Sequence, residues 1–117
     1  MANVELTEIE AAWLAGIMEG DGCFTLHFGK NAKGTPRLAL AMTDQDIVDR
    51  VAVLLKTESR TTDWRTKGNK AIWRTTLARL EDLKYTLEKI YPFMGVRRKQ
   101  RIDELLTNIN GRQPSQT

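Results

Sequence analysis

The chain has 117 residues, of which 41% are hydrophobic and 28% charged, which is typical of one domain with a modest core of its own. With a single cysteine and a single histidine, it cannot form an internal disulfide or a zinc site built from clusters of these residues. No apolar run is long enough to span a membrane, and the first residues lack a signal-peptide pattern. We therefore expect an intracellular protein, in the cytoplasm or an organelle matrix.

Charge is distributed unevenly, although the net charge is only +3. The first 21 residues carry five acids and no Lys or Arg, whereas residues 59–79 carry six bases and one acid. A second basic cluster consists of Arg97, Arg98, Lys99 and Arg101. Such clusters favour a polyanionic partner, and solvated loops and helix ends are the alternative explanation.

The first predicted element is a helix that begins after Thr7 and ends near Gly20. Thr7 and Glu10 have the spacing of a capping box. Small residues recur at every fourth position, at Ala12, Gly16 and Gly20. Each helical glycine costs about 1 kcal/mol relative to alanine. We therefore expect another helix to approach this stripe closely, and the same helix of a second copy is one such partner.

A β-hairpin follows the first helix. Residues 23–29 alternate between apolar and polar side chains, residues 31–34 have the composition of a turn, and residues 37–42 alternate again. One face of this hairpin is apolar. The other face is small or polar and is available to a ligand.

A second helix, capped by Thr43 or Asp44, is predicted to end at about Lys56. A second hairpin follows, with strands at residues 59–66 and 70–78 and a turn at residues 67–70. In its second strand, Trp73, Thr75 and Leu77 are predicted to face one way, and Ile72, Arg74 and Thr76 the other.

Two more helices are predicted, at residues 80–90 and 96–110. Pro92 prevents the first from continuing, and Gly111 ends the second. We expect residues 1–112 to form one domain and residues 113–117 to be a flexible tail. The element order predicts an α+β domain with four antiparallel strands and helices on one face of the sheet. The opposite face carries polar and basic residues, and strands of this kind can enter the major groove of DNA.

Residues 14–22, Leu-Ala-Gly-Ile-Met-Glu-Gly-Asp-Gly, resemble the signature motif of the LAGLIDADG homing endonucleases. The element order also agrees with the αββαββαα fold and saddle-shaped sheet of that family, so the resemblance covers essentially residues 7–109. One copy of the motif implies a homodimer in this family. The resemblance thus implies a homodimeric, sequence-specific endonuclease that makes a metal-dependent double-strand cut at a long, near-palindromic DNA site and serves intron or intein mobility. The alternative is an RNA maturase or another binding-only nucleic-acid protein on the same fold.

The resemblance makes Asp21 the catalytic acid and metal ligand, with the Gly20 carbonyl as a further ligand and Glu19 in a structural role. It implies Mg²⁺ as the cofactor, with Mn²⁺ as a substitute and Ca²⁺ binding without supporting cleavage. This choice is chemically sensible, because hard cations take oxygen ligands from one or two carboxylates together with substrate phosphates. Such ions promote phosphodiester hydrolysis.

Two other parts of the family site match less closely. Asp44, with Gln45 as the next candidate, corresponds to a polar residue at the start of the second helix. Val48 occupies a position that is usually basic. Arg97, with Lys99 as a competing candidate, corresponds to a lysine before the last helix whose charge would stabilise the transition-state phosphate.

The resemblance also predicts the contact surfaces. The expected base contacts lie on the non-core face of the strands and are Thr25, His27, Asn31, Thr35, Arg37, Arg60, Thr62, Arg74 and Thr76. The expected phosphate contacts are Lys33, Lys67, Lys70 and Arg98. The expected dimer contacts are Ala12, Trp13, Gly16, Ile17 and Gly20. A shift of one residue in strand register would move the base contacts to the opposite face.

Overall fold

The computed structural model describes residues 2–30, 33–62 and 71–112, with the backbone alone for Thr62. Its elements are α1 (Glu8–Asp21), β1 (Gly22–His27), β2 (Thr35–Met42), α2 (Gln45–Leu55), β3 (Arg60–Thr62), β4 (Ile72–Leu77), α3 (Leu80–Ile90), the 3₁₀ turn η1 (Tyr91–Phe93) and α4 (Val96–Asn110). The predicted order of helices and hairpins is confirmed. The predictions for Asn31, Lys67, Lys70 and the tail at residues 113–117 lie outside the described residues.

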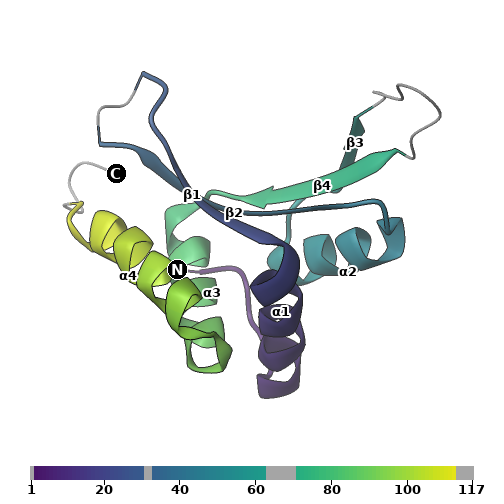
Figure 1. Cartoon of the computed structure of the whole chain (residues 1–117), viewed down its shortest axis with the longest axis horizontal. Coiled ribbons are helices and arrows are strands. Elements are labelled where there is room, and N and C mark those ends of the chain that lie inside the picture. Colours follow the sequence, from purple (N-terminus) through teal and green to yellow (C-terminus); the bar gives the residue numbers. More distant parts are fainter. Residues whose placement is uncertain (1, 31–32, 63–70, 113–117) are drawn as a thin grey trace.

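The four strands form one antiparallel sheet in the order β1-β2-β4-β3. β2 and β4 pair in its centre, with Leu38 opposite Leu77, and thereby join the two hairpins. Figure 1 shows the helices on one side of the sheet, while the strands rise toward both ends on the other side. Among the described elements, none covers that second face. The predicted fold class, an α+β domain with helices on one face, is thus confirmed.

The hydrophobic core fills the space between the sheet and the helices. Alternate strand residues such as Phe24, Leu38, Leu40 and Leu77 point into it and are almost fully buried. Each buried side chain of this size contributes about 2 kcal/mol. A register shift would expose all of them together, so this alternation fixes the register. Within the described part of the chain, no helix combines the length and the apolar character that a membrane crossing requires.

The transition from α1 to β1 is unusually tight. The helix begins with the predicted capping box, in which Thr7 Oγ1 accepts from the Glu10 N–H at 3.1 Å and Glu10 Oε1 accepts from the Thr7 N–H at 2.9 Å. At its other end, a Cβ on Gly22 would lie 2.7 Å from the Met18 carbonyl oxygen. Only glycine therefore fits at the point where the chain leaves the helix and enters the strand.

The N-terminal segment is anchored to α3, which the sequence patterns did not predict. Val4 and Leu6 are buried in the core. The buried Asp82 carboxylate accepts hydrogen bonds from the Asn3 and Val4 N–H groups and from Arg79 Nε. Burial raises the pKa of Asp82, but the hydrogen bonds from Val4, Arg79 and Asn3 outweigh it and hold the pKa below its usual value. The carboxylate therefore remains charged in the folded protein at neutral pH.

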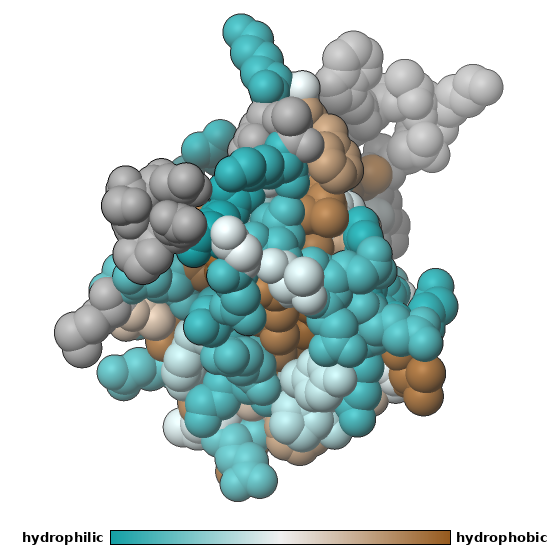
Figure 2. Space-filling model, turned by 90° about the vertical axis from the view of Figure 1, so that its left-hand side faces the viewer, coloured by the Kyte–Doolittle hydropathy of each residue, from teal (hydrophilic) through white to brown (hydrophobic). Residues whose placement is uncertain are grey.

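The far end of α4 supports the β1–β2 hairpin. Asn108 Nδ2 donates to the Lys33 carbonyl at 2.8 Å, and Arg112 Nη2 donates to the Gly34 carbonyl at 2.6 Å. Gly34 has a φ of 84°, which favours glycine, and a Cβ there would lie 2.9 Å from the Phe28 ring. Figure 2 shows that the side of the molecule with α4 and this hairpin is mostly hydrophilic, with hydrophobic residues confined to narrow strips.

Candidate functional site

The last turn of α1 separates the two acids of the motif. Asp21 is the final residue of the helix and is exposed to solvent. Glu19 lies half-buried, and its Oε1 accepts a hydrogen bond from the Gly95 N–H at 2.7 Å. Because Gly95 is the N-cap residue of α4, Glu19 ties the end of α1 to the start of α4. The structure thus gives Glu19 a packing role and leaves Asp21 available to a ligand.

The backbone around Asp21 is rich in oxygen. The C-terminal end of a helix carries partial negative charge on its last carbonyl groups. Arg98 Nε and Nη2 approach the Glu19 carbonyl at 3.3 and 3.2 Å, and the Gly22 N–H bonds to the Met18 carbonyl. Neither contact uses the Gly20 carbonyl. An exposed carboxylate beside helix-end carbonyls matches the oxygen ligands that a hard divalent cation takes.

Three consecutive basic residues at the start of α4 lie in different surroundings. Arg97 is exposed. Arg98 lies over the Phe24 ring at 5.3 Å and binds α1, so its guanidinium is already used to hold the fold together. Lys99 Nζ lies 5.3 Å from the centre of the Tyr91 ring. Arg97 is therefore the member of this group that is best placed to reach a ligand, and the assignment of Arg98 to a phosphate stays a prediction.

The start of α2 carries the second predicted part of the site. Asp44 is the N-cap residue of α2, as predicted, but its exposed side chain makes no capping hydrogen bond. Asp44 lies two residues beyond Met42, the last residue of β2. Gln45 follows it and is also exposed. Val48 is fully buried in the core, so a basic residue at this position would be buried in the same way.

No group of three or more His, Cys, Asp or Glu side chains converges on one point in residues 2–30, 33–62 and 71–112. Within the described chain, Asp21 therefore belongs to no such cluster, and helix-end carbonyl groups are the other oxygen donors beside it. Magnesium commonly binds through one or two carboxylates, keeps several waters and takes the remaining ligands from substrate phosphates. The residues present fit a metal site that a substrate and a second carboxylate complete.

The strand register places the predicted base contacts on one face of the sheet. Thr25 is opposite Arg37 and His27 opposite Thr35 in the first hairpin, and Arg60 is opposite Arg74 in the second. The β2–β4 ladder aligns the two hairpins by setting Ala39 opposite Thr76 and Ala41 opposite Arg74. The described side chains of this set are exposed or half-buried on the uncovered face, namely Thr25, His27, Thr35, Arg37, Arg60, Arg74 and Thr76. Lys33 is exposed near the end of the first hairpin.

One side of α1 is left open. Ile9, Ala12, Gly16 and Gly20 are exposed along it, and Ile9 is 83% exposed. A Cβ at Gly16 or Gly20 would meet no atom of the described chain within 4 Å. The other predicted interface residues, Trp13 and Ile17, are half-buried beside this strip. The Arg50 guanidinium lies over the Trp13 ring at 4.0 Å from its centre and links α2 to this side of α1.

Several residues that shape these surfaces were given no individual role by the sequence patterns. Arg101 Nε donates to the Phe24 carbonyl at 2.8 Å and so supports the outer strand β1 from α4. Lys56 and Glu58 lie next to the basic face of β4. No local sequence pattern distinguishes them, because a charged residue that lines a hollow and one that is simply exposed to solvent occur in the same sequence context. Their position depends on how α2 leads into β3.

Comparison with known proteins places this arrangement in a family. A sequence model described as a LAGLIDADG-like domain matches residues 8–91. A search of curated proteins found no match. Among solved structures, the homing endonuclease I-CvuI in complex with its target has a TM-score of 0.68 at 20% identity, and the match covers 88% of this chain and 67% of that chain.

Two further structures show the same fold. The group I intron-encoded homing endonuclease I-CeuI, complexed with DNA, has a TM-score of 0.62 at 16% identity over 92% of this chain and 57% of that chain. The LAGLIDADG meganuclease I-AabMI, bound to uncleaved DNA, has a TM-score of 0.65 at 13% identity over 86% of this chain and 35% of that chain. The family match spans most of the chain and includes the motif, α1, both hairpins and α3, and we conclude that the protein belongs to the LAGLIDADG family.

Proposed function

We propose that this protein is a homodimeric endonuclease that cuts both strands of DNA at a specific, near-palindromic site with the aid of Mg²⁺. The observation that carries the proposal is the position of Asp21. It is exposed at the end of α1, at the point where the chain enters the uncovered sheet face, and it is not used in the fold as Glu19 is. A carboxylate placed there has a clear function only when a cation and a substrate reach it.

The open side of α1 supports the dimer. Exposed small residues on a helix allow a second helix to approach closely, and Ile9 adds exposed apolar area to the same side. Pairing of two α1 helices about a two-fold axis would bring Asp21 of both chains near the axis. Identical subunits present identical surfaces, so the recognised DNA site would be near-palindromic.

The donor groups at the end of α1 support the metal requirement. Asp21 and the Gly20 carbonyl would hold Mg²⁺, which lowers the pKa of bound water and acts as a Lewis acid when present. Mn²⁺ would substitute, whereas Ca²⁺ would bind without supporting cleavage. Arg97 would place its positive charge near the phosphate. We assign Asp44 and Gln45, at the start of α2, a supporting role toward water at the site.

The charge on the sheet face supports DNA as the substrate. Arg60 and Arg74 stand directly opposite each other in adjacent strands, and like charges in that arrangement destabilise a sheet. The Glu58 carboxylate pairs with Arg60 and offsets part of that repulsion, and a polyanion that lies on this face would offset the rest. Threonine and arginine side chains on paired strands are also suited to reading base edges in the major groove.

A cleavage selection from a randomised DNA library tests the proposal. In Mg²⁺ we expect enrichment of a near-palindromic site that is cut on both strands, and in Ca²⁺ we expect binding without products. Asp21→Asn should abolish cutting while binding remains. An RNA maturase would instead bind nucleic acid without cutting DNA in any divalent ion. Absence of binding to DNA or RNA at low salt would exclude both functions.

A further inference from the structure

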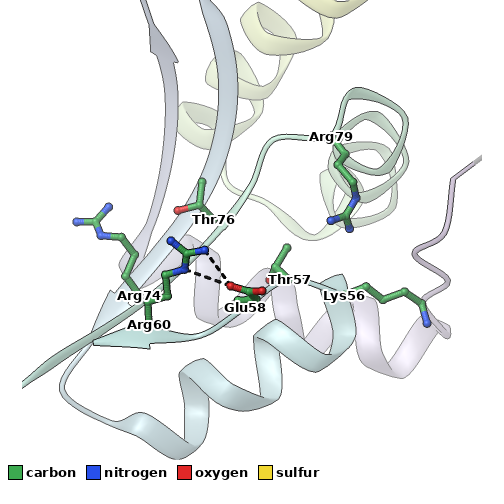
Figure 3. Close-up of a pocket in the computed structure, with 7 residues that line it drawn as sticks. All are labelled: Lys56, Thr57, Glu58, Arg60, Arg74, Thr76 and Arg79. Carbon is green, nitrogen blue, oxygen red and sulfur yellow. Dashed lines mark hydrogen bonds and ion pairs between the residues drawn. The ribbon is translucent and has the colours of Figure 1, made fainter. Parts of the chain in front are cut away.

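A basic hollow of about 500 Å³ lies at the β3 edge of the sheet. Figure 3 shows the side chains around it, which come from β3, β4, the end of α2 and the chain before α3. The residues that concern us are Lys56, Glu58, Arg60, Arg74, Thr76 and Arg79. Four of these six are basic and one is acidic. None of Lys56, Glu58 and Arg79 is among the DNA contacts predicted from the family resemblance.

The hollow forms where strand pairing stops. Arg60 opposite Arg74 is the first pair of the β3–β4 ladder, and the preceding residues 56–59 leave the strand geometry. Arg79 fixes one wall, because its Nη2 donates to the Leu55 carbonyl at 2.9 Å and its Nε to Asp82 at 2.6 Å. The Thr57 and Thr75 hydroxyl groups are hydrogen-bonded to each other beneath it. The hollow is therefore built by several elements and opens beside the uncovered face.

Its position at the sheet edge indicates which part of a DNA duplex would reach it. Four strands spaced by 4.7–4.9 Å span about 14 Å, whereas the major groove is about 12 Å wide. When the middle of such a sheet lies in the groove, its outer edge meets the sugar-phosphate backbone that borders the groove. Side chains at this edge are thus suited to phosphate oxygens and not to base edges.

In the free protein, the Glu58 carboxylate is already bound to Arg60, one of the basic residues of the hollow. Glu58 Oε2 accepts hydrogen bonds from Arg60 Nη2 at 2.9 Å and from Arg60 Nε at 3.3 Å. Both side chains are largely exposed, at 80% for Arg60 and 76% for Glu58, so the pair is weak and open to exchange. Arginine binds carboxylate and phosphate oxygens with the same paired geometry, so the two anions compete for one guanidinium.

We propose that the sugar-phosphate backbone of DNA passes along this hollow, that Arg60 binds one of its phosphates, and that Glu58 is displaced from Arg60 when that phosphate enters. Lys56 and Arg79 line other parts of the same hollow and add positive charge along the path of the backbone. The inference rests on the proposed function, because it assumes DNA on the sheet face. It adds a phosphate site at the β3 edge and gives Glu58 the role of an internal competitor. Glu58 would weaken binding to every sequence to a similar extent and so limit non-specific binding.

The test measures binding of the full chain to a random-sequence duplex by fluorescence anisotropy in Ca²⁺, over a series of salt concentrations. Lys56→Gln should weaken binding several-fold for all sequences and reduce the slope of log K against log salt by about one. Glu58→Gln should strengthen binding about two- to five-fold. Lys89→Gln and Glu88→Gln, which make the same charge changes on α3, are the matched controls and should have little effect.

A double-mutant cycle tests whether Glu58 acts through Arg60. The gain from Glu58→Gln should vanish when Arg60→Gln is already present, because the competitor then has no guanidinium to hold. Equal gains in both backgrounds, or effects of Lys56→Gln and Glu58→Gln no larger than those of the α3 controls, would overturn the inference. Failure of the proposed function looks different, because it appears in the unmodified protein, either as no binding to the duplex or as binding without cleavage in Mg²⁺.

Discussion

Glu19 Oε1 lies 2.7 Å from the backbone nitrogen of Gly95 and so caps the first turn of α4 from the last turn of α1. Arg98, three residues further along α4, returns the contact through the Glu19 carbonyl. A Cβ on Gly95 would lie 3.3 Å from Glu19 Oε1, so the two segments are in close contact. This link holds the start of α4, which carries Arg97, against the end of α1, which carries Asp21. It also gives Glu19 a structural role that Asp21 does not share.

Substitution of the two acids should therefore affect different properties. Glu19→Ala removes a helix cap and should lower the free energy of unfolding by about 1–2 kcal/mol, whereas Glu19→Gln keeps an acceptor and should cost less. Asp21→Asn alters an exposed side chain and should change stability by less than about 0.5 kcal/mol while it abolishes cleavage. Urea unfolding combined with a DNA cleavage assay measures both. Equal loss of stability in Glu19→Ala and Asp21→Asn would contradict this separation.

Gly16→Leu should separate the dimer without unfolding the chain. A Cβ at Gly16 meets no atom of the described chain within 4 Å, so any steric conflict must come from a second molecule. We expect sedimentation equilibrium to show a folded monomer and cleavage to be lost. Gly22→Ala is the contrasting variant, because its Cβ meets the Met18 carbonyl and should destabilise the chain itself. A Gly16→Leu protein that remains a fully active dimer would rule out the helix pairing.

The Asp82 anchor should make stability depend on acid pH. The pKa of Asp82 is lowered in the folded state, so its contribution is fully present above the unfolded pKa of about 4 and is lost as pH falls through the folded pKa below that value. Asp82→Asn should cost about 2–3 kcal/mol at pH 7, because it breaks a buried, hydrogen-bonded ion pair. Urea unfolding at several pH values should show the difference between the two proteins shrinking below about pH 4. A constant difference across that range would argue against the charged anchor.

Arg112→Ala should loosen the β1–β2 hairpin while the rest of the core stays intact. The substitution removes the hydrogen bond that Arg112 Nη2 donates to the Gly34 carbonyl. We expect faster amide hydrogen exchange in Thr35–Met42 and weaker DNA binding, with unchanged exchange in α1. Thr107→Ala, an exposed change in the last turns of α4 shortly before Arg112, is the control. Identical exchange in the two variants would show that Arg112 does not hold the hairpin.

The sequence predicted the fold well where its signals were local. The Thr7–Glu10 capping box and the alternation around Arg74 depend on residues close together in the chain, and the structure has both. The motif at residues 14–22 also indicated the LAGLIDADG family, which the family match confirms. Its position at a helix end is a local property, and this is why the sequence alone predicts Asp21 at the end of the first helix.

The features that the sequence did not predict depend on distant contacts. Asp82 binds Asn3 and Val4 from 78 or more positions away, and no periodic pattern connects an N-terminal segment to an acid in the third helix. The pairing of β2 with β4 is likewise set by packing and not by a turn.

The central β2–β4 ladder has a consequence for how the chain folds. Each hairpin can form from neighbouring residues, but Leu38 meets Leu77 only after α2 and β3 have been enclosed in a loop, and closing that loop is an entropic barrier. We therefore expect this junction to belong to the folding nucleus. Truncation of Leu38 would slow refolding, whereas truncation at the outer strand β1 would mainly accelerate unfolding.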